Sequence, residues 1–262
     1  NTSISNMNRN VYTYDKLDRV ITEGFTGVDG KFDENGKWNE SSSKTTIIHA
    51  AYKYDGAGNV IKKLDAVAYK NASCSDAAQK IEKGYGTEYA YNPMNKVTAV
   101  LDAESKEKYN RTLSSAPQRF KYDALGRKME EIVLREKANG TSYSIYESIT
   151  KFTYDDAGNI IKTEIRKEDG TYVTVASAAY DYLGNAITKT DGNGNTTIYS
   201  YNAFGKVRSE TTPGDDSIES NTIKYQYDTM GNLRAVQRKN STSYDTMTYI
   251  EGDNHGRILK KA

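Results

Sequence analysis

Few side chains of this sequence belong to the types that carry out catalysis. The chain has two histidines, His49 and His255, and one cysteine, Cys74. A Ser-His-Asp triad could form around either histidine, because Ser and Asp are plentiful, but no nucleophile-elbow motif accompanies them. Cys74 lies among polar residues, where a lone thiol is more often incidental than nucleophilic. We therefore expect no enzymatic activity and no cofactor, and we assign no catalytic residue.

Metal binding has two candidates. An aspartate recurs along the chain and could form a row of carboxylates, and the segment DGNGNT (191–196) has the beginning of a calcium-loop pattern. That loop needs Gly at its sixth position and Glu at its twelfth, where this chain has Thr196 and Asn202. Zinc needs more Cys and His ligands than the chain has. We predict no metal site and interpret the recurring aspartates as caps of turns.

The charge pattern excludes two kinds of partner. Lys plus Arg (36) nearly balance Asp plus Glu (35) without a long basic run, so we expect no nucleic-acid binding. The apolar runs are too short to span a bilayer, so we expect no membrane insertion. The sequence begins at Asn1 and shows no signal peptide, which suggests a segment of a longer protein.

The composition resembles that of a disordered protein in one respect only. Hydrophobic residues make up 36% of the chain, and the mean hydropathy is -0.80, values that are common in disordered chains. However, the chain has 22 Tyr. Disordered chains are poor in aromatic residues, whereas Tyr is enriched in strands. We therefore expect an ordered, strand-rich chain.

The tyrosines and aspartates belong to one repeated motif, aromatic-x-Tyr-Asp-x-x-Gly-(Asn/Arg/Lys)-aliphatic. Its defining residues are Tyr14 and Asp15; Tyr54, Asp55 and Gly58; Tyr91, Asn92 and Asn95; Tyr122, Asp123 and Gly126; Tyr154, Asp155 and Gly158; Tyr180, Asp181 and Gly184; Tyr201, Asn202 and Gly205; and Tyr227, Asp228 and Gly231. A ninth, degenerate copy has Gly252 in place of Tyr, followed by Asp253 and Gly256. The sequence therefore contains about nine tandem repeats.

Each copy has the residue preferences of a type I turn, with Asp first and Gly fourth. The Asp carboxylate can accept a hydrogen bond from the N–H two residues on, and a Gly with positive φ forms the bulge of a common hairpin loop. Asp18 and Asn95 stand where other copies have Gly, and both residue types tolerate the left-handed region. The motif therefore predicts a hairpin turn.

The flanks of the turn are predicted to be strands. Aromatic residues two apart, such as Tyr52 and Tyr54, share one face, and an aliphatic residue after the turn is suited to pair across the hairpin. Lys128 replaces that aliphatic residue in the fourth copy, which leaves the local register open. Further Asn-Gly and Asp-Gly turns, including Asp29-Gly30, Asn35-Gly36 and Asn139-Gly140, predict the return of the chain.

The predicted fold is a single all-β array over residues 1–262, an antiparallel β-hairpin repeat meander. The links near 26–45, 70–84 and 103–117 are predicted to be variable loops on the edge opposite the Tyr-Asp turns, with a short helix at 74–83. The repeat tyrosines are expected to pack over neighbouring hairpins, because the chain is poor in aliphatic residues. Tyr residues outside the repeat are left without an assigned role: Tyr69, Tyr85, Tyr143, Tyr146 and Tyr244.

The Tyr-Asp-x-x-Gly motif and the segment TDGNGNTTIYSYNAFGKV (190–207) resemble the YD-repeat, or Rhs-repeat, family over nearly the whole chain. The family includes bacterial Rhs toxins, wall-associated proteins, insecticidal toxin-complex subunits and teneurins. The resemblance implies a curved or spiralling strip that builds a hollow shell. In polymorphic toxins of the family this shell encloses a C-terminal toxin.

The resemblance implies a non-enzymatic structural segment of a large bacterial protein that is secreted or lies at the cell surface. Its implied partners are the adjoining repeats of the parent protein and an encapsulated C-terminal toxin. A rival interpretation is a carbohydrate- or receptor-binding module that uses exposed Tyr, with polysaccharide as the partner. The open strand edges also predict self-association.

Overall fold

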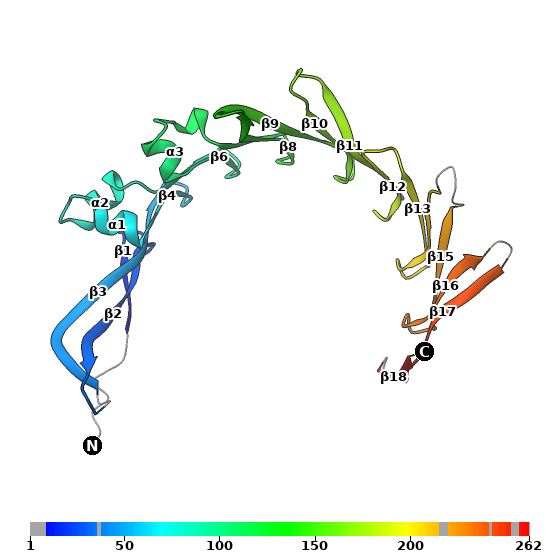
Figure 1. The fold of residues 1–262 in the computed structure, drawn as a ribbon, viewed down its shortest axis with the longest axis horizontal. Helices are drawn as coiled ribbons and strands as arrows, with labels where there is room; N and C mark the ends of the chain where they lie inside the picture. The colour runs from blue at the N-terminus through cyan, green and yellow to red at the C-terminus, as the bar shows by residue number, and fades with distance from the viewer. Residues whose placement is uncertain (1–8, 36–37, 215–219, 241–242, 253–256, 262) are drawn as a thin grey trace. The chain divides into compact units, whose positions relative to one another are not determined.

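The computed structural model describes residues 9–35, 38–214, 220–240, 243–252 and 257–261 (Figure 1). Within these residues the chain forms two compact units, which are described separately. The first unit comprises Asn1–Gly126 and Glu131–Glu147, and the second comprises Arg127–Glu130 and Ser148–Ala262. The repeat motif occurs in both units, and their organisation as one array stays a prediction.

In the first unit, successive strands from β1 to β7 pair antiparallel with one another. These strands are β1 (Arg9–Tyr14), β2 (Val20–Phe32), β3 (Trp38–Tyr54), β4 (Val60–Asp65), β5 (Thr87–Tyr91), β6 (Val97–Leu101) and β7 (Gln118–Tyr122). The strands β8 (Lys128–Asn139) and β9 (Ser142–Tyr154) follow and belong partly to each unit.

In the second unit, β9 pairs antiparallel with β10, and the same order continues to β18. These strands are β10 (Ile160–Arg166), β11 (Tyr172–Tyr180), β12 (Ala186–Asp191), β13 (Thr196–Tyr201), β14 (Val207–Thr212), β15 (Asn221–Tyr227), β16 (Leu233–Asn240), β17 (Ser243–Gly252) and β18 (Ile258–Lys261). The predicted antiparallel hairpin meander is thereby confirmed. Its predicted curvature stays a prediction.

A β-bulge stands next to the repeat Tyr in each unit. The register shifts between Lys53 and Tyr54 in the first unit, for example, so that Tyr54 lies opposite Val60. The same shift places Tyr201 opposite Val207 in the second unit. The extra residue of a bulge accommodates the tight turn and increases the local twist. The aliphatic residue after the turn therefore pairs across the hairpin, as its position predicts.

The predicted loop at 26–45 is wrong. β2 and β3 continue through this region as one long hairpin, in which Phe32 lies opposite Trp38. The few aromatic and β-branched residues there, such as Val28 and Phe32, favour strands over loops, and the segment extends a hairpin that is already paired on either side. Asp29-Gly30 forms no turn, because it lies within β2 beside a register shift. The chain turns instead after Asp33, whose carboxylate accepts a hydrogen bond from the N–H of Asn35 (3.0 Å).

The other two predicted loops contain helices. The segment 70–84 includes the end of α1 (Ala66–Asn71) and all of α2 (Ala77–Lys83), which confirms the short helix expected at 74–83. The segment 103–117 includes α3 (Ala103–Glu107) and a 3-10 turn at Leu113–Ser115. Asp65, Asp76 and Asp102 cap the three α-helices by accepting hydrogen bonds from backbone N–H groups in the first turn.

The two apolar clusters among the described residues lie where strands of the first unit meet the helical insertions. Leu64 is fully buried and packs with Ala51 of β3 and Ile81 of α2. A second cluster joins Ala99, Leu101 and Ala116. A sheet face must be covered to bury its side chains, and Figure 1 shows the helices beside the strands of the first unit. In the described part of the second unit only Ile149 and Ala235 are buried hydrophobic side chains, so backbone pairing and hydrogen bonds carry more of its cohesion.

Candidate functional site

The Tyr-Asp turns share one backbone geometry. In the turn at Asp155, the N–H of Asp155 donates to the carbonyl of Asn159 (3.0 Å), and the N–H of Gly158 donates to the carbonyl of Asp155 (3.1 Å). Gly158 has a φ of 92°, and the substitutes Asp18 and Asn95 both have a φ of 57°. The left-handed position that the sequence predicts is therefore present, and non-glycine residues occupy it in two copies. The ninth-copy residues Asp253 and Gly256 lie outside the described residues.

In most copies the aspartate caps the turn with both carboxylate oxygens. In the second unit, Oδ1 of Asp181 accepts from the N–H groups of Leu183 (2.9 Å) and Asn185 (2.8 Å). The Asn185 side-chain amide donates to Oδ2 (2.9 Å). This side-chain hydrogen bond is the main reason that the pKa of the Asp181 carboxyl is lowered. Among the described residues, no group of three His, Cys, Asp or Glu side chains is placed to hold a metal ion.

The type of the fifth residue of the turn, which follows the Gly, correlates with the type of the first residue. Where the turn begins with Asp, the fifth residue is Asn or Arg, which donates to the second carboxylate oxygen, as Arg19 does to Asp15 (2.7 Å). Where the turn begins with Asn, at Asn92 and Asn202, the fifth residue is Lys. The amide of Asn has a donor in place of the second oxygen, so a donating partner would be left unpaired. This correlation between the first and fifth residues is visible in the sequence, but the repeat motif as defined above does not include it.

The repeat tyrosines form a ladder that links successive hairpins. Each hydroxyl donates to the carbonyl of the residue that begins the second strand of the preceding hairpin. The pairs are Tyr54 with Val20, Tyr91 with Val60, Tyr122 with Val97, Tyr154 with Lys128, Tyr180 with Ile160, Tyr201 with Ala186 and Tyr227 with Val207, at 2.7–3.1 Å. Lys128 takes part through its carbonyl, so its polar side chain does not interrupt the ladder. The degenerate ninth copy lacks this hydroxyl, because Gly252 replaces Tyr.

The tyrosine rings lie half-buried between hairpins, with basic side chains over some of them. The Arg19 guanidinium is 4.7 Å from the centre of the Tyr54 ring and donates to the carbonyl of Asp55 (2.9 Å). In the second unit, Arg127 does the same with Tyr154 (4.8 Å) and the carbonyl of Asp155 (3.0 Å). Burial raises the pKa of Tyr54. The repeat residues are thus used in contacts within the strip.

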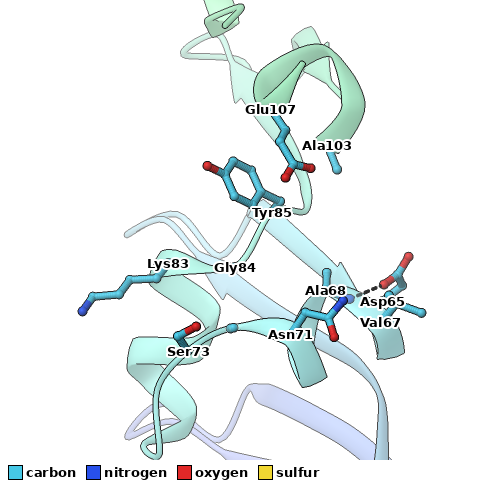
Figure 2. Close-up of a pocket in the computed structure, with 11 residues that line it drawn as sticks. Asp65, Val67, Ala68, Asn71, Ser73, Lys83, Gly84, Tyr85, Ala103 and Glu107 are labelled. Carbon is cyan, nitrogen blue, oxygen red and sulfur yellow. Dashed lines mark hydrogen bonds between the residues drawn. The ribbon is translucent and has the colours of Figure 1, made fainter. Parts of the chain in front are cut away.

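A cavity of about 430 Å³ lies between the helical insertions of the first unit (Figure 2). Apolar residues such as Val67 and Ala103 line part of it, and Asn71, Tyr85 and Glu107 add polar groups. The Tyr85 ring is 48% exposed, and Figure 2 shows the Glu107 carboxylate beside this ring. Two strands, β5 and β6, separate the two insertions in the sequence, so no local sequence pattern predicts this cavity.

The remaining candidates for chemistry are dispersed. His49 is half-exposed, and its Nε2 lies 3.9 Å from a carboxylate oxygen of Glu23. His255 lies outside the described residues, and Cys74 is a half-buried free thiol. The five Tyr without an assigned role divide among several environments: Tyr69 packs on the core, Tyr85 lines the cavity, Tyr143 and Tyr146 are exposed, and Tyr244 lies under the Lys224 ammonium. Within the described residues, no helix combines the length and apolarity that crossing a bilayer requires.

Comparisons with known proteins agree with this geometry. Residues 180–217 match the family described as RHS Repeat. The fold is similar to that in the crystal structure of TcdB2-TccC3-TEV, with 14% identity and a TM-score of 0.54 over 97% of this chain. It is also similar to TcdB2-TccC3 without the hypervariable C-terminal region, with 14% identity and a TM-score of 0.52 over 95% of this chain. No curated protein matches the sequence.

Both units are built from repeated antiparallel β-hairpins. The resemblance to the YD-repeat, or Rhs-repeat, family is thereby confirmed, with an RHS repeat at residues 180–217. The chain spans only 14% and 13% of the two structures that it matches.

Proposed function

We propose that this chain is a structural segment of a large toxin-complex protein, in which it builds part of a shell wall. The tyrosine ladder is the observation that carries this proposal. The repeat residues form the turn, cap it, or bond to the preceding hairpin, as Tyr201 does to Ala186 (2.8 Å). The repeated residues are thus engaged within the strip, which favours a structural role over a catalytic one.

The finer assignments follow from the family. The protein is bacterial and is secreted or placed at the cell surface, and the adjoining repeats of the parent protein continue the strip on either side. The shell that they build encloses a C-terminal toxin. The fold is similar to that in the TcdB2-TccC3 structures, which supports a role in building a shell.

Protease protection in the parent protein tests this function. Tyr154→Phe, Tyr201→Phe and Tyr227→Phe together remove three rungs of the ladder in the second unit. We expect the intact parent to protect its C-terminal region from added protease, and the triple variant to lose that protection. Tyr143→Phe, Tyr146→Phe and Tyr182→Phe alter exposed rings and serve as the matched control. A C-terminal region that is cleaved equally fast in all three proteins would contradict an enclosing shell.

The cavity at Tyr85 supports a second candidate, carbohydrate binding. A half-exposed aromatic ring can cover the apolar face of a sugar, while the side chains of Asn71 and Glu107 are suited to bond hydroxyl groups. Pockets with a few convergent polar groups on an apolar surface are typical of ligand sites. Carbohydrate binding through an exposed Tyr is thereby assigned to the cavity at Tyr85 in the first unit.

A glycan array with cell-wall polysaccharides, followed by calorimetry, tests the second candidate. We expect Tyr85→Ala to abolish binding without changing the melting temperature, and Tyr143→Ala, at another exposed ring, to leave binding intact. Failure of every polysaccharide to bind, or equal binding by both variants, would exclude this site.

A further inference from the structure

The tips of the Tyr-Asp turns carry a row of exposed apolar side chains. The third residue of the turn is Leu17, Ala57, Met94, Leu125, Ala157, Leu183, Phe204 or Met230. In the second unit, Leu183, Phe204 and Met230 are 67%, 65% and 67% exposed. In the first unit, Leu17 and Leu125 are similarly exposed. Such side chains gain little from hydrophobic burial within the described chain.

The geometry of the turn does not require an apolar residue there. The turn at 191–195 lies at the opposite edge of the second unit and has the same bonds. The N–H of Gly194 donates to the carbonyl of Asp191 (3.1 Å), and the N–H of its third residue, Asn193, donates to Oδ1 of Asp191 (2.9 Å). The third residue there is polar. In the turn at 167–171, which also lies at that opposite edge, the third residue is Asp169. An apolar third residue is therefore a feature of the edge that carries the Tyr-Asp turns, and the hydrogen bonds of the turn do not require it.

The turn tips of the second unit also lack charge over three successive copies. The second residue of these turns is Tyr182, Ala203 or Thr229, and Tyr182 is 95% exposed. Apolar side chains that are exposed in a contiguous group commonly mark an interaction surface. The second and third residues of these turns offer no ion pair to a charged partner, so a partner that covers them gains by burying apolar area.

We propose that this turn-tip row, Leu183, Phe204 and Met230 in the second unit, is a contact surface for the turn edge of a second copy of this chain. Each hairpin has two strands, so turns recur about every 10 Å along the strip. An apolar row with the same spacing is present on a second copy, which allows a self-complementary, two-fold contact. This proposal does not depend on the shell function, because it rests on the turns alone.

The exposed area indicates a weak contact. An aromatic side chain covers about 150–250 Å² when buried, so Phe204 leaves on the order of 100 Å² accessible. Three such side chains with part of Tyr182 give roughly 400 Å² on each partner, compared with about 800 Å² in a standard interface. We therefore expect dissociation constants on the order of 100 μM.

Sedimentation velocity over a concentration series from about 10 μM to about 1 mM tests the proposal. The variant Leu183→Asn, Phe204→Asn and Met230→Asn places at each tip the residue that Asn193 already provides in the same turn geometry. We expect the unaltered chain to sediment faster as concentration rises, and the triple variant to remain monomeric. Circular dichroism checks that the variant is folded, and Phe204→Asn alone replaces it if it is not, with an expected weakening of several-fold.

The control variant Ile187→Thr, Ile198→Thr and Met247→Thr removes exposed apolar side chains from strands of the same unit. It should associate like the unaltered chain. Association that survives the turn-tip variant would overturn the proposal in favour of pairing between open strand edges. A chain that stays monomeric at the highest concentration would overturn it as well.

Discussion

At the scale of single residues, the Tyr-Asp turn is specified by its backbone and not by any ligand. Its fourth residue must adopt a positive φ, and its first residue must offer oxygen atoms to the N–H groups of the turn. Gly158 and Asp155 meet these requirements, and Asn95 and Asn92 meet them in another copy with different side chains. Substitutions that keep the geometry should therefore be tolerated, whatever their chemistry.

Gly158→Asn should be nearly neutral, whereas Gly158→Val should cost more than about 1–2 kcal/mol of left-handed strain, because β-branching adds to the strain. A Cβ at this position would meet no atom within 4 Å, so steric contact with neighbours does not enter the comparison. The free energy of unfolding in urea measures the difference. Equal stability of the two variants would contradict the turn geometry as the cause.

The paired choice of the first and fifth residues gives a second prediction. Asp181→Asn should cost about 1 kcal/mol, because the new side-chain amide would face the donating amide of Asn185 in place of an acceptor. The double variant Asp181→Asn with Asn185→Lys reproduces the combination of Asn202 and Lys206 and should recover most of that loss. A double-mutant cycle of urea unfolding measures the coupling. Additive losses in the double variant would show that the two positions act independently.

At the scale of the element, each hairpin is held to the preceding one by a hydrogen bond as well as by strand pairing. The hydroxyl of Tyr154, at the end of β9, donates a hydrogen bond to the carbonyl of Lys128, at the start of β8 (2.7 Å). A backbone carbonyl is available whichever residue stands there. This explains why the motif tolerates Lys, Ile, Ala or Val at the accepting position.

Tyr154→Phe should lower the free energy of unfolding by about 0.5–1.5 kcal/mol, because it removes this hydrogen bond and keeps the ring. Tyr14 belongs to the first repeat, has no preceding hairpin among the described residues, and is 54% exposed. Tyr14→Phe should therefore be neutral. A loss at Tyr14 as large as that at Tyr154 would argue against the ladder as a source of stability.

The hairpins were predictable from the sequence because their signals are local. Asp and Gly set the turn over four residues, and the Tyr two positions after another aromatic residue sets the strand. The ladder was not predictable, because its acceptor is a carbonyl that every residue has. The polar composition of residues 26–45 predicts a loop because polar residues outnumber the strand-forming ones, whereas the structure has the long hairpin of β2 and β3. The cavity at Tyr85 needs two insertions to meet, which no local pattern reveals.

At the scale of the whole molecule, the contacts between strands join those that follow one another in the sequence. Repeat proteins built in this way have stabilities that are close to a sum over units and their neighbouring interfaces. The helical insertions add an apolar core to the first unit, which the described part of the second unit lacks. Local damage should therefore remain local.

Leu64→Ala tests this expectation at the centre of the first unit's core. Leu64 is fully buried against Ala51 and Ile81, so its truncation should cost about 2–5 kcal/mol locally. We expect hydrogen exchange to accelerate in β3, β4 and α2, and to remain unchanged in β12–β14 of the second unit, because strands contact mainly those that follow one another in the sequence. Leu183→Ala makes the same change at a 67% exposed turn tip and should alter exchange nowhere beyond its own turn. Uniform acceleration along the whole chain in the Leu64 variant would instead mean that the strip unfolds as one cooperative body, in which distant hairpins stabilise one another without direct contact.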